Sequence, residues 1–324
     1  QTCGTLQLPL NDVGVMALDY KGQNGIATSI GHAPLSALID VEAGSRNAIA
    51  ESLTNLVWAP LEDQLKSVSL SANWMWPCRN AGEDVRLYNA VKAVSDFAID
   101  LGINIPTGKD SLSMTQKYPD GNVMAPGTVI ISAGAHCNDI TKVVEPVLKT
   151  DANNKIYYLN LSKDSFKLGG SSFAQSLDKI GSDTPDIKDA AYFKKAFNAI
   201  QTCISDGLIT AGHDVSAGGL LTCLLEMCFA DNQLGAEINL SALNENDAVK
   251  LLFSENAGLV VQTNQPGAFE AILNNSQVDF TQIGSAINSA NLTLINGLET
   301  YLFNIAEYRD YWFETSYLLD VHQS

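Results

Sequence analysis

Residues 212–221 place a His, an Asp, a Ser and a pair of glycines directly before an apolar run. The apolar residues of 220–229 recur at helical spacing, which predicts a buried helix beginning near Gly219. Short polar residues and glycines in this position build a helix cap, and free amides at a helix start suit an anion or a metal-bridged phosphate. Taken alone, the stretch is more often a capped loop that leads into a core helix.

A second group of oxygen ligands lies near the N-terminus. Asn47, Glu51 and Asn55 follow one another at four-residue spacing, so on a helix they share one polar stripe. A carboxylate and two carboxamides in a row could ligate Mg²⁺. On spacing alone a solvated helix face is the more frequent explanation. Asp12, which precedes the first predicted strand, has no special meaning by itself and could be a turn residue.

Two further stretches could hold phosphate. Lys109, Asp110 and Ser111 follow Gly108 at a predicted strand end, although the Walker A spacing is absent. Residues 169–172, Gly-Gly-Ser-Ser, offer unhindered backbone amides at a helix start, but a tight turn is the commoner explanation of such a pair of glycines. His32, His136 and His322 are scattered without metal spacing, which indicates structural or surface residues.

The overall charge narrows the classes of ligand. Nineteen basic and 36 acidic side chains give a net charge of −17 over 324 residues, which would repel nucleic acid and anionic membranes. A phosphorylated ligand would then depend on divalent metal, which favours Mg-ATP over a bare phosphate ester. The six cysteines have no zinc spacing, no run of apolar residues could span a membrane, and the start lacks both a Met and a secretory leader. We therefore expect a cytoplasmic protein whose sequence begins inside a longer chain.

Alternating helices and strands predict an α/β protein of two domains, with the boundary between residues 145 and 146. Helices are predicted at 42–58, 82–101, 190–206, from 219, at 268–274 and 305–320. Strands are predicted at 13–20, 68–76, 128–136, 156–161, 258–262, 281–286 and 292–294. A further strand is predicted to start at 103–105 and to run into residues 108–114. Residues 25–41 are predicted as strand and loop.

These motifs together resemble the phosphoribosylformylglycinamidine synthase family in its large, single-chain form. The resemblance covers essentially the whole chain and rests on ordered strings: Asp12, Glu51-Ser52-Leu53-Thr54-Asn55, Leu70-Ser71-Ala72-Asn73-Trp74-Met75, Gly82-Glu83-Asp84, Gly108-Lys109-Asp110-Ser111-Leu112-Ser113-Met114, His213-Asp214-Val215-Ser216-Ala217-Gly218-Gly219-Leu220 and Leu252-Phe253-Ser254-Glu255. The resemblance implies one two-domain unit of the aminoimidazole ribonucleotide synthetase (PurM-like) fold, an α/β (α+β) fold whose N-terminal sheet pairs with a partner sheet into a barrel. It is similar to the second of the family's two such units.

The resemblance also implies a function and its residues. The family converts formylglycinamide ribonucleotide to the amidine, using ATP and glutamine-derived ammonia, and its second unit holds an auxiliary Mg-nucleotide without turnover. Asp12, Glu51, Asn55 and Asp214 match magnesium ligands, Asn11 and Ser216 match nucleotide contacts, and Asp110 and Ser111 match a motif lining the ligand cleft.

The resemblance leaves the partners and the alternatives as follows. The expected cofactors are Mg²⁺ and ATP or ADP, and the expected small-molecule partner is a phosphoribosyl substrate. The first unit and the glutaminase domain would be missing, so the isolated chain would be inactive and could pair with itself as a homodimer. The alternatives are a stand-alone ATP-dependent enzyme of the PurM superfamily and a purely structural nucleotide-binding module.

Overall fold

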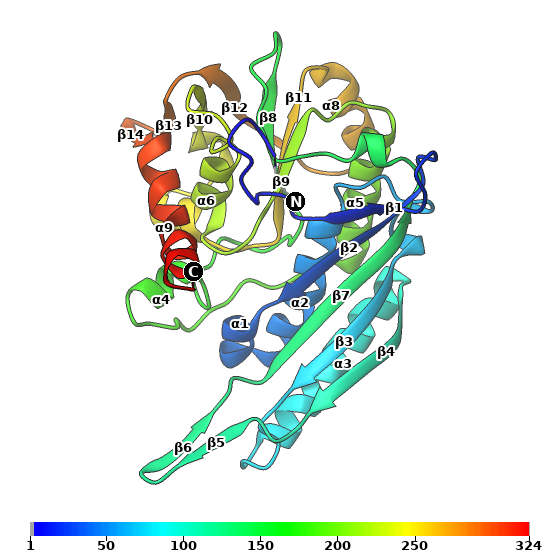
Figure 1. Ribbon diagram of the computed structural model, residues 1–324, viewed down its shortest axis with the longest axis vertical. Coiled ribbons are helices and arrows are strands. Elements are labelled where there is room, and N and C mark those ends of the chain that lie inside the picture. Colours follow the sequence, from blue (N-terminus) through cyan, green and yellow to red (C-terminus); the bar gives the residue numbers. More distant parts are fainter. Residues whose placement is uncertain (1–2, 324) are drawn as a thin grey trace.

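Two β-sheets with helices packed against them make up the computed structural model of this chain, which describes residues 3–323 (Figure 1). The first sheet has the order β1-β2-β7-β3-β4 and the second has the order β14-β13-β10-β12-β8-β11-β9. A separate two-stranded hairpin, β5–β6, projects from the body (Figure 1). The predicted α/β class is confirmed, while the predicted domain boundary falls in residues 138–154, between the strands of the two sheets.

The first sheet is formed by β1 (Gly14–Ala17), β2 (Gly25–His32), β3 (Ser69–Met75), β4 (Asn104–Ser111) and β7 (Thr128–Cys137). Helices α1 (Pro34–Ile39), α2 (Val41–Leu56) and α3 (Glu83–Leu101) accompany it. Along β2, every second residue is buried and the others are exposed. Because α2 packs on β2 and β7, the buried residues face the helices, and the opposite face of the sheet lies open.

The second sheet is formed by β8 (Lys155–Asn160), β9 (Ala211–Val215), β10 (Leu234–Asn239), β11 (Gly258–Thr263), β12 (Thr281–Asn288), β13 (Asn291–Asn296) and β14 (Glu299–Asn304). Its helices are α4 (Ser172–Ser176), α5 (Ala190–Ser205), α6 (Gly219–Glu226), α7 (Ala248–Phe253), α8 (Pro266–Asn275) and α9 (Ile305–Gln323). The hairpin comprises β5 (Thr115–Tyr118) and β6 (Gly121–Met124), and short 3-10 turns occur at η1 (Gln64–Ser67), η2 (Ile140–Lys142) and η3 (Leu240–Leu243).

One hydrophobic core joins the two sheets. Leu53 and Trp58 from the α2 region pack in the same buried cluster as Phe193 and Phe197 of α5. Phe97 of α3 meets Phe193 edge-on, with ring centroids 6.0 Å apart. Removing these large side chains from water stabilises the contact between the sheets and fixes α2 against the second sheet.

Most long predicted elements are confirmed, and the differences have local causes. Residues 25–41, predicted as strand and loop, also contain the six-residue helix α1, which begins at Pro34, where the fixed φ of proline suits the first helical turn. The helices and strands that the sequence did not predict are α1, β5, β6, β9, β10, α7 and β14. These are all four to six residues long, too short for a period to stand out.

The structure of residues 212–221 differs most from the one predicted. Residues 211–215 form the fully buried strand β9, which pairs antiparallel with β11, so the predicted capped loop was wrong for this part. Helix α6 does begin at Gly219, but its N-cap is Gly218 at φ 89°, without a side-chain cap. Glycine is required there because a positive φ is strained for other residues.

Among residues 3–323, no helix combines the length and the apolar character needed to cross a membrane. The expectation about how the sequence begins falls in part on Gln1 and Thr2, which lie outside the described residues.

Candidate functional site

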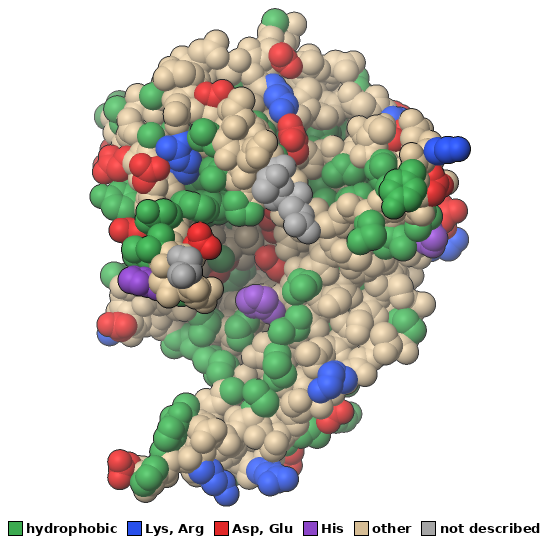
Figure 2. Space-filling view, in the orientation of Figure 1, with side chains coloured by type: hydrophobic (Ala, Val, Ile, Leu, Met, Phe, Trp, Pro, Cys, Tyr) green, Lys and Arg blue, Asp and Glu red, His purple; other side chains and the backbone are tan. Residues whose placement is uncertain are grey.

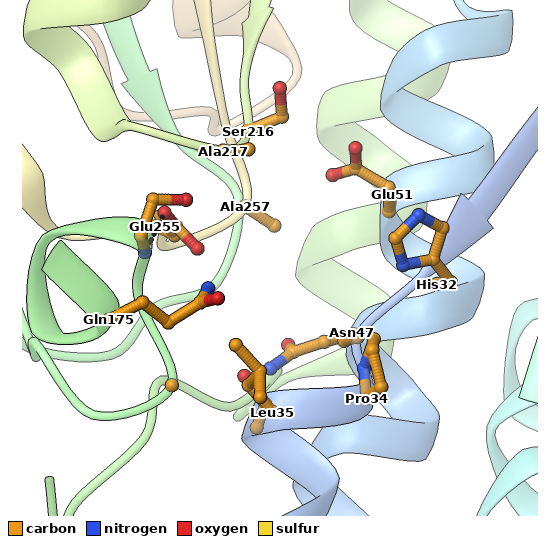
Figure 3. A pocket seen from close by; sticks show the side chains of 14 residues that line it. His32, Pro34, Leu35, Asn47, Glu51, Gln175, Ser216, Ala217, Glu255 and Ala257 are labelled. Atoms are coloured by element: carbon orange, nitrogen blue, oxygen red, sulfur yellow. Dashed lines mark hydrogen bonds between the residues drawn. The ribbon is translucent and has the colours of Figure 1, made fainter. Parts of the chain in front are cut away.

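A cleft of about 440 Å³ lies where the two sheets meet. Asn47 and Glu51 of α2 and His32 of β2 form one wall, and Gln175, Ser216 and Glu255 form the other (Figure 3). In the space-filling view, acidic side chains and a histidine gather around a hollow in the middle of the molecule (Figure 2). His32, expected to be structural or on the surface, is thus a wall residue of the cleft.

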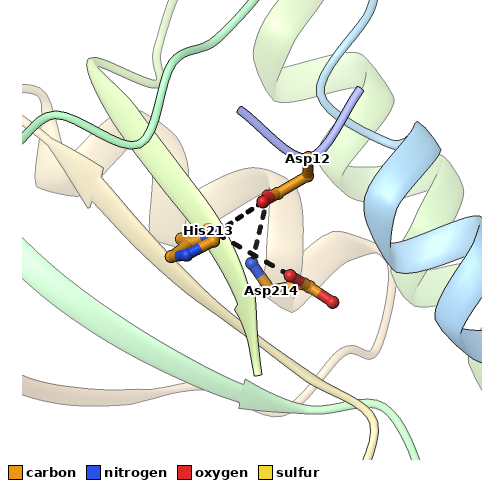
Figure 4. Close-up of side chains that lie close together, drawn as sticks. All are labelled: Asp12, His213 and Asp214. Carbon is orange, nitrogen blue, oxygen red and sulfur yellow. Dashed lines mark hydrogen bonds and ion pairs between the residues drawn. The ribbon is translucent and has the colours of Figure 1, made fainter. Parts of the chain in front are cut away.

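A buried acidic cluster lies beside this cleft. His213 Nδ1 is 2.7 Å from Asp12 Oδ1 and 3.7 Å from Asp214 Oδ1 (Figure 4). One ligand atom from each of these three residues lies within 4.8 Å of the others. The N-terminal segment and β9, some 200 residues apart in sequence, supply them, so only the fold creates this cluster.

Close backbone approaches hold the acidic side chains in place. A Cβ at Gly212 would lie 2.1 Å from Trp58 Cζ3, so β9 is pressed directly against the end of α2. There the Thr54 hydroxyl donates to Asp214 Oδ2 at 3.2 Å. A Cβ at Gly31 would lie 2.2 Å from the backbone N of Ser52. Helix α2 therefore lies directly on β2. This contact places Glu51, which precedes Ser52, at the cleft.

Burial and crowding raise the pKa values of the carboxyl groups in this region. Burial, followed by the charges of Asp12 and Glu255, raises the pKa of Glu51 from 4.5 to about 8. Burial, followed by Asp12 and Glu51, raises the pKa of Asp214 well above its usual value. The pKa of Asp12 is also raised, mainly by burial. Three carboxyl groups that each disfavour ionisation in the metal-free chain form an arrangement that a divalent cation would stabilise.

Both ring nitrogens of His213 face carboxylates. Burial works against its protonation, but Asp12 and a hydrogen bond to Glu226 outweigh burial and raise the pKa of His213 well above its usual value. Nε2 lies within hydrogen-bond distance of Glu226 Oε2, at 2.9 Å, and Nδ1 forms an ion pair with Asp12 Oδ1, at 2.7 Å. The oxygens of Asp12, Asp214 and Glu51 remain as donors, and this all-oxygen set fits Mg²⁺.

Glu255 was missed as a site residue, although the string Leu252-Phe253-Ser254-Glu255 had pointed to its neighbourhood. Its Oε1 accepts the backbone N–H of Ser172 at 2.7 Å and that of Gly218 at 2.8 Å. The carboxylate thereby joins the start of α4 to the turn before α6. Two amides expected to bind an anion at 169–172 and 212–219 are therefore bonded to a protein carboxylate.

The amide side chains differ in their surroundings. Asn47 Nδ2 donates to the Pro185 carbonyl at 2.7 Å, and Asn55 Nδ2 donates to the Ile30 carbonyl at 3.1 Å. Asn11 lies beside Asp12, and its Oδ1 is buried with no hydrogen-bond partner within residues 3–323. A buried acceptor without a partner costs free energy, which indicates a ligand or water contact at this position.

Lys109, Asp110 and Ser111 are placed elsewhere. They lie on the edge strand β4, where Lys109 Nζ donates to the Asp110 carbonyl at 3.2 Å and to Ser111 Oγ at 3.3 Å. None of the three lines the cleft that holds Glu51 and Ser216. The structure thus brings Asp12, Asn11, Glu51, Asn55, Asp214 and Ser216 to one region and leaves the Lys109 group apart from it.

Two protein-family models match the chain. Residues 1–136 match the FGAR-AT PurM_N-like domain, and residues 152–296 match the C-terminal domain of AIR synthase related proteins. A probable phosphoribosylformylglycinamidine synthase of Arabidopsis thaliana is 39% identical over 99% of this chain, and the human phosphoribosylformylglycinamidine synthase is 37% identical over 99%. The chain belongs to the phosphoribosylformylglycinamidine synthase family. It spans only 23% and 24% of the length of these two relatives, so it corresponds to one PurM-like half.

Solved structures confirm the PurM-like fold. Thermotoga maritima PurL in complex with FGAR matches with a TM-score of 0.70 at 16% identity, covering 93% of this chain and 48% of that one. The HypE–HypF complex matches with a TM-score of 0.64 at 15% identity, covering 91% of this chain and 93% of that one. The Arabidopsis phosphoribosylformylglycinamidine synthase is named as chloroplastic/mitochondrial. The cytoplasmic location expected for the present chain therefore stays a prediction.

Proposed function

We propose that this chain is the second PurM-like half of a phosphoribosylformylglycinamidine synthase, the ATP-dependent ligase of purine biosynthesis. In this role its cleft holds ATP or ADP through Mg²⁺ as an auxiliary ligand. The observation that supports this most strongly is the crowding of Asp12, Asp214 and Glu51 beside the cleft, with the pKa of all three raised. Such a site binds a polyphosphate only when divalent metal offsets the repulsion.

The proposed roles follow the positions of the side chains. Asp12, Glu51, Asn55 and Asp214 hold the magnesium ions, and Ser216 in the cleft wall contacts the nucleotide. Asn11, with its unpartnered oxygen, is a further nucleotide contact. Magnesium, when bound, neutralises phosphate charge, while the residues of this chain bind and orient the nucleotide. Lys109, Asp110 and Ser111 are not part of this cleft, and we assign them to a contact outside it.

The proposed partner is the other PurM-like half of the same enzyme. The face of the first sheet opposite α2 exposes apolar side chains, including Met16 at 75%, Ile26 at 41% and Ile30 at 58%. An apolar sheet face of this kind is usually covered by another layer, here the sheet of the companion half. Without it, two copies of the isolated chain pair through this face. Sedimentation at increasing concentration should show a dimer for the wild type and a monomer for Ile30→Asp.

Nucleotide binding tests the site itself. Calorimetry of the isolated chain with ADP should show binding in Mg²⁺ and none in EDTA. Asp214→Asn should weaken Mg-ADP binding at least tenfold because a buried ligand oxygen is replaced by an amide. Asp279→Asn, which makes the same change at a side chain 76% exposed, is the matched control and should bind like the wild type. Equal affinity of the two variants would refute the metal assignment.

Turnover separates the proposed function from its alternative. A stand-alone ATP-dependent enzyme is the second candidate, because the two-domain unit covers 93% of the matched chain in the HypE–HypF complex. The isolated chain is given ATP, Mg²⁺, ammonia and formylglycinamide ribonucleotide, alone and with its companion half. We expect product only when both halves are present. Product from the isolated chain would overturn the auxiliary role.

A further inference from the structure

Two hydrogen bonds and an ion pair run from the acidic cluster to helix α9. The Trp312 indole N–H on α9 donates to Glu226 Oε1 at 2.7 Å. The other oxygen of Glu226 lies 2.9 Å from His213 Nε2, and His213 Nδ1 lies 2.7 Å from Asp12 Oδ1. Four side chains, from α9, α6, β9 and the N-terminal segment, are therefore linked one to the next by direct contacts.

The inner part of this line is shielded from water. The side chains of Asp12, His213 and Glu226 are 5%, 7% and 18% exposed. Hydrogen bonds and ion pairs in such surroundings are strong, and a group that loses its partner there is costly to leave unpaired. The orientation of each group is thus set by the next, and the last one, Trp312, lies on α9.

Asp12 depends on this support more than a residue of a helix or strand would. It lies in a bend ahead of β1. Besides the ion pair with His213, the hydrogen bond that its carboxylate accepts within residues 3–323 comes from the backbone N–H of Asp214, at the long distance of 3.4 Å. The position of its carboxylate is therefore decided chiefly by the His213 imidazole, which is itself held between Asp12 and Glu226.

Helix α9 depends on Trp312 in turn. Ile305 is its only fully buried residue within Ile305–Gln323. Trp312 packs against Phe229, with ring centroids 5.7 Å apart, and its indole reaches Glu226 on α6. This indole is thus a principal contact between the middle of α9 and the body of the second sheet.

We propose that Trp312 and Glu226 are positioning residues for Asp12, acting through His213, and that they couple the seating of α9 to nucleotide occupancy of the cleft. The inference rests on the proposed Mg-nucleotide site. Because coupling free energies are reciprocal, a change at Trp312 alters nucleotide affinity, and nucleotide binding alters the environment of Trp312.

Trp312→Phe removes the indole N–H and the five-membered ring that carries it, while keeping an aromatic six-membered ring against Phe229. We expect it to weaken Mg-ADP binding about three- to tenfold, and Glu226→Gln, one step nearer to Asp12, to weaken it about tenfold or more. Trp76→Phe is the matched control, since the Trp76 indole is buried without an acceptor in the described part of the chain. It should leave the affinity unchanged.

Tryptophan fluorescence gives a second measurement. The nucleotide-induced change in emission of the wild type, less that of Trp312→Phe, isolates Trp312 from the other three tryptophans. We expect this difference to be measurable in the wild-type background. In the Glu226→Gln background, the same difference, Glu226→Gln less Glu226→Gln with Trp312→Phe, should vanish. A merely structural contact would lower the melting temperature without changing either affinity or this signal.

The outcomes separate the two proposals. If the wild type binds Mg-ADP and both Trp312→Phe and Glu226→Gln bind it equally well, the coupling is refuted and the nucleotide site stands. If the wild type itself does not bind Mg-ADP, the proposed function fails and the coupling with it. If Trp312→Phe does not fold, as judged by circular dichroism, Glu226→Gln decides alone, because it keeps an acceptor for the indole.

Discussion

The pH dependence of stability offers a direct test of the crowded carboxylates. The pKa of Glu51 is raised from 4.5 to about 8. The folded chain therefore keeps a proton on Glu51 that the unfolded chain releases above about pH 4.5. Since the unfolded state then binds fewer protons, the free energy of unfolding falls as the pH rises through this window and levels off above about 8.

The size of the effect follows from the same values. At 1.36 kcal/mol per pKa unit, the difference corresponds to at most about 5 kcal/mol. Because Glu51 lines an open cleft, solvent screens part of this, and we expect about 2 to 3 kcal/mol. Glu51→Gln removes the ionisation, so in EDTA at pH 8 the variant should be more stable than the wild type by this amount.

The assay is urea denaturation in EDTA at pH 5, 6.5 and 8, followed by circular dichroism. Glu62→Gln, at an exposed carboxylate, is the control and should follow the wild type. Adding Mg²⁺ and ADP should stabilise the wild type and raise its stability at pH 8 towards that at pH 5, while Glu51→Gln gains little. If Glu51→Gln loses as much stability as the wild type between pH 5 and pH 8, crowding at Glu51 is not the cause.

Two further predictions concern the packing that positions the site. Gly212→Ala places a Cβ 2.1 Å from the Trp58 ring and should lower the free energy of unfolding by about 2 to 4 kcal/mol in urea denaturation, whereas Gly267→Ala, in open space on α8, should be neutral or stabilising. Equal effects of the two would contradict the close packing of β9. Arg46 on α2 donates two hydrogen bonds to Asp186, at 2.7 and 2.9 Å, in the segment that leads to α5. Arg46→Ala should therefore lower the free energy of unfolding by about 2 to 3 kcal/mol. Arg46→Lys keeps the charge but loses the paired geometry, and a loss as large as that of Arg46→Ala would show that charge contributes little.

The open sheet face and the relay to α9 both fit the proposal that this chain is one half of a larger enzyme. Helices cover one face of the first sheet, and the opposite face is available for a partner sheet. Glu226 of α6 connects His213 of β9 to Trp312 of α9. A mutation on α9 could thus change the site without touching it, provided that the hydrogen bond to Glu226 is affected.

Local sequence patterns determined most of the long elements. The helix predicted at 82–101 is confirmed as α3, and Gly102 caps its C-terminus at φ 75°. Helical spacing and capping act between residues a few positions apart, so they can be recognised in the sequence. The ordered motif strings likewise determined the family, because residues that serve one site keep their order along the chain.

Only the tertiary structure decided what surrounds each candidate. The stretch at 212–215 contains glycine and polar residues and was predicted as a loop, yet it is a buried strand because β11 and Trp58 enclose it. Glu255 became a site residue through two amides brought to it from distant segments. The relay from Asp12 to Trp312 joins residues 300 positions apart in sequence. Contacts of this kind depend on how layers pack, and no local pattern of residue types contains that information.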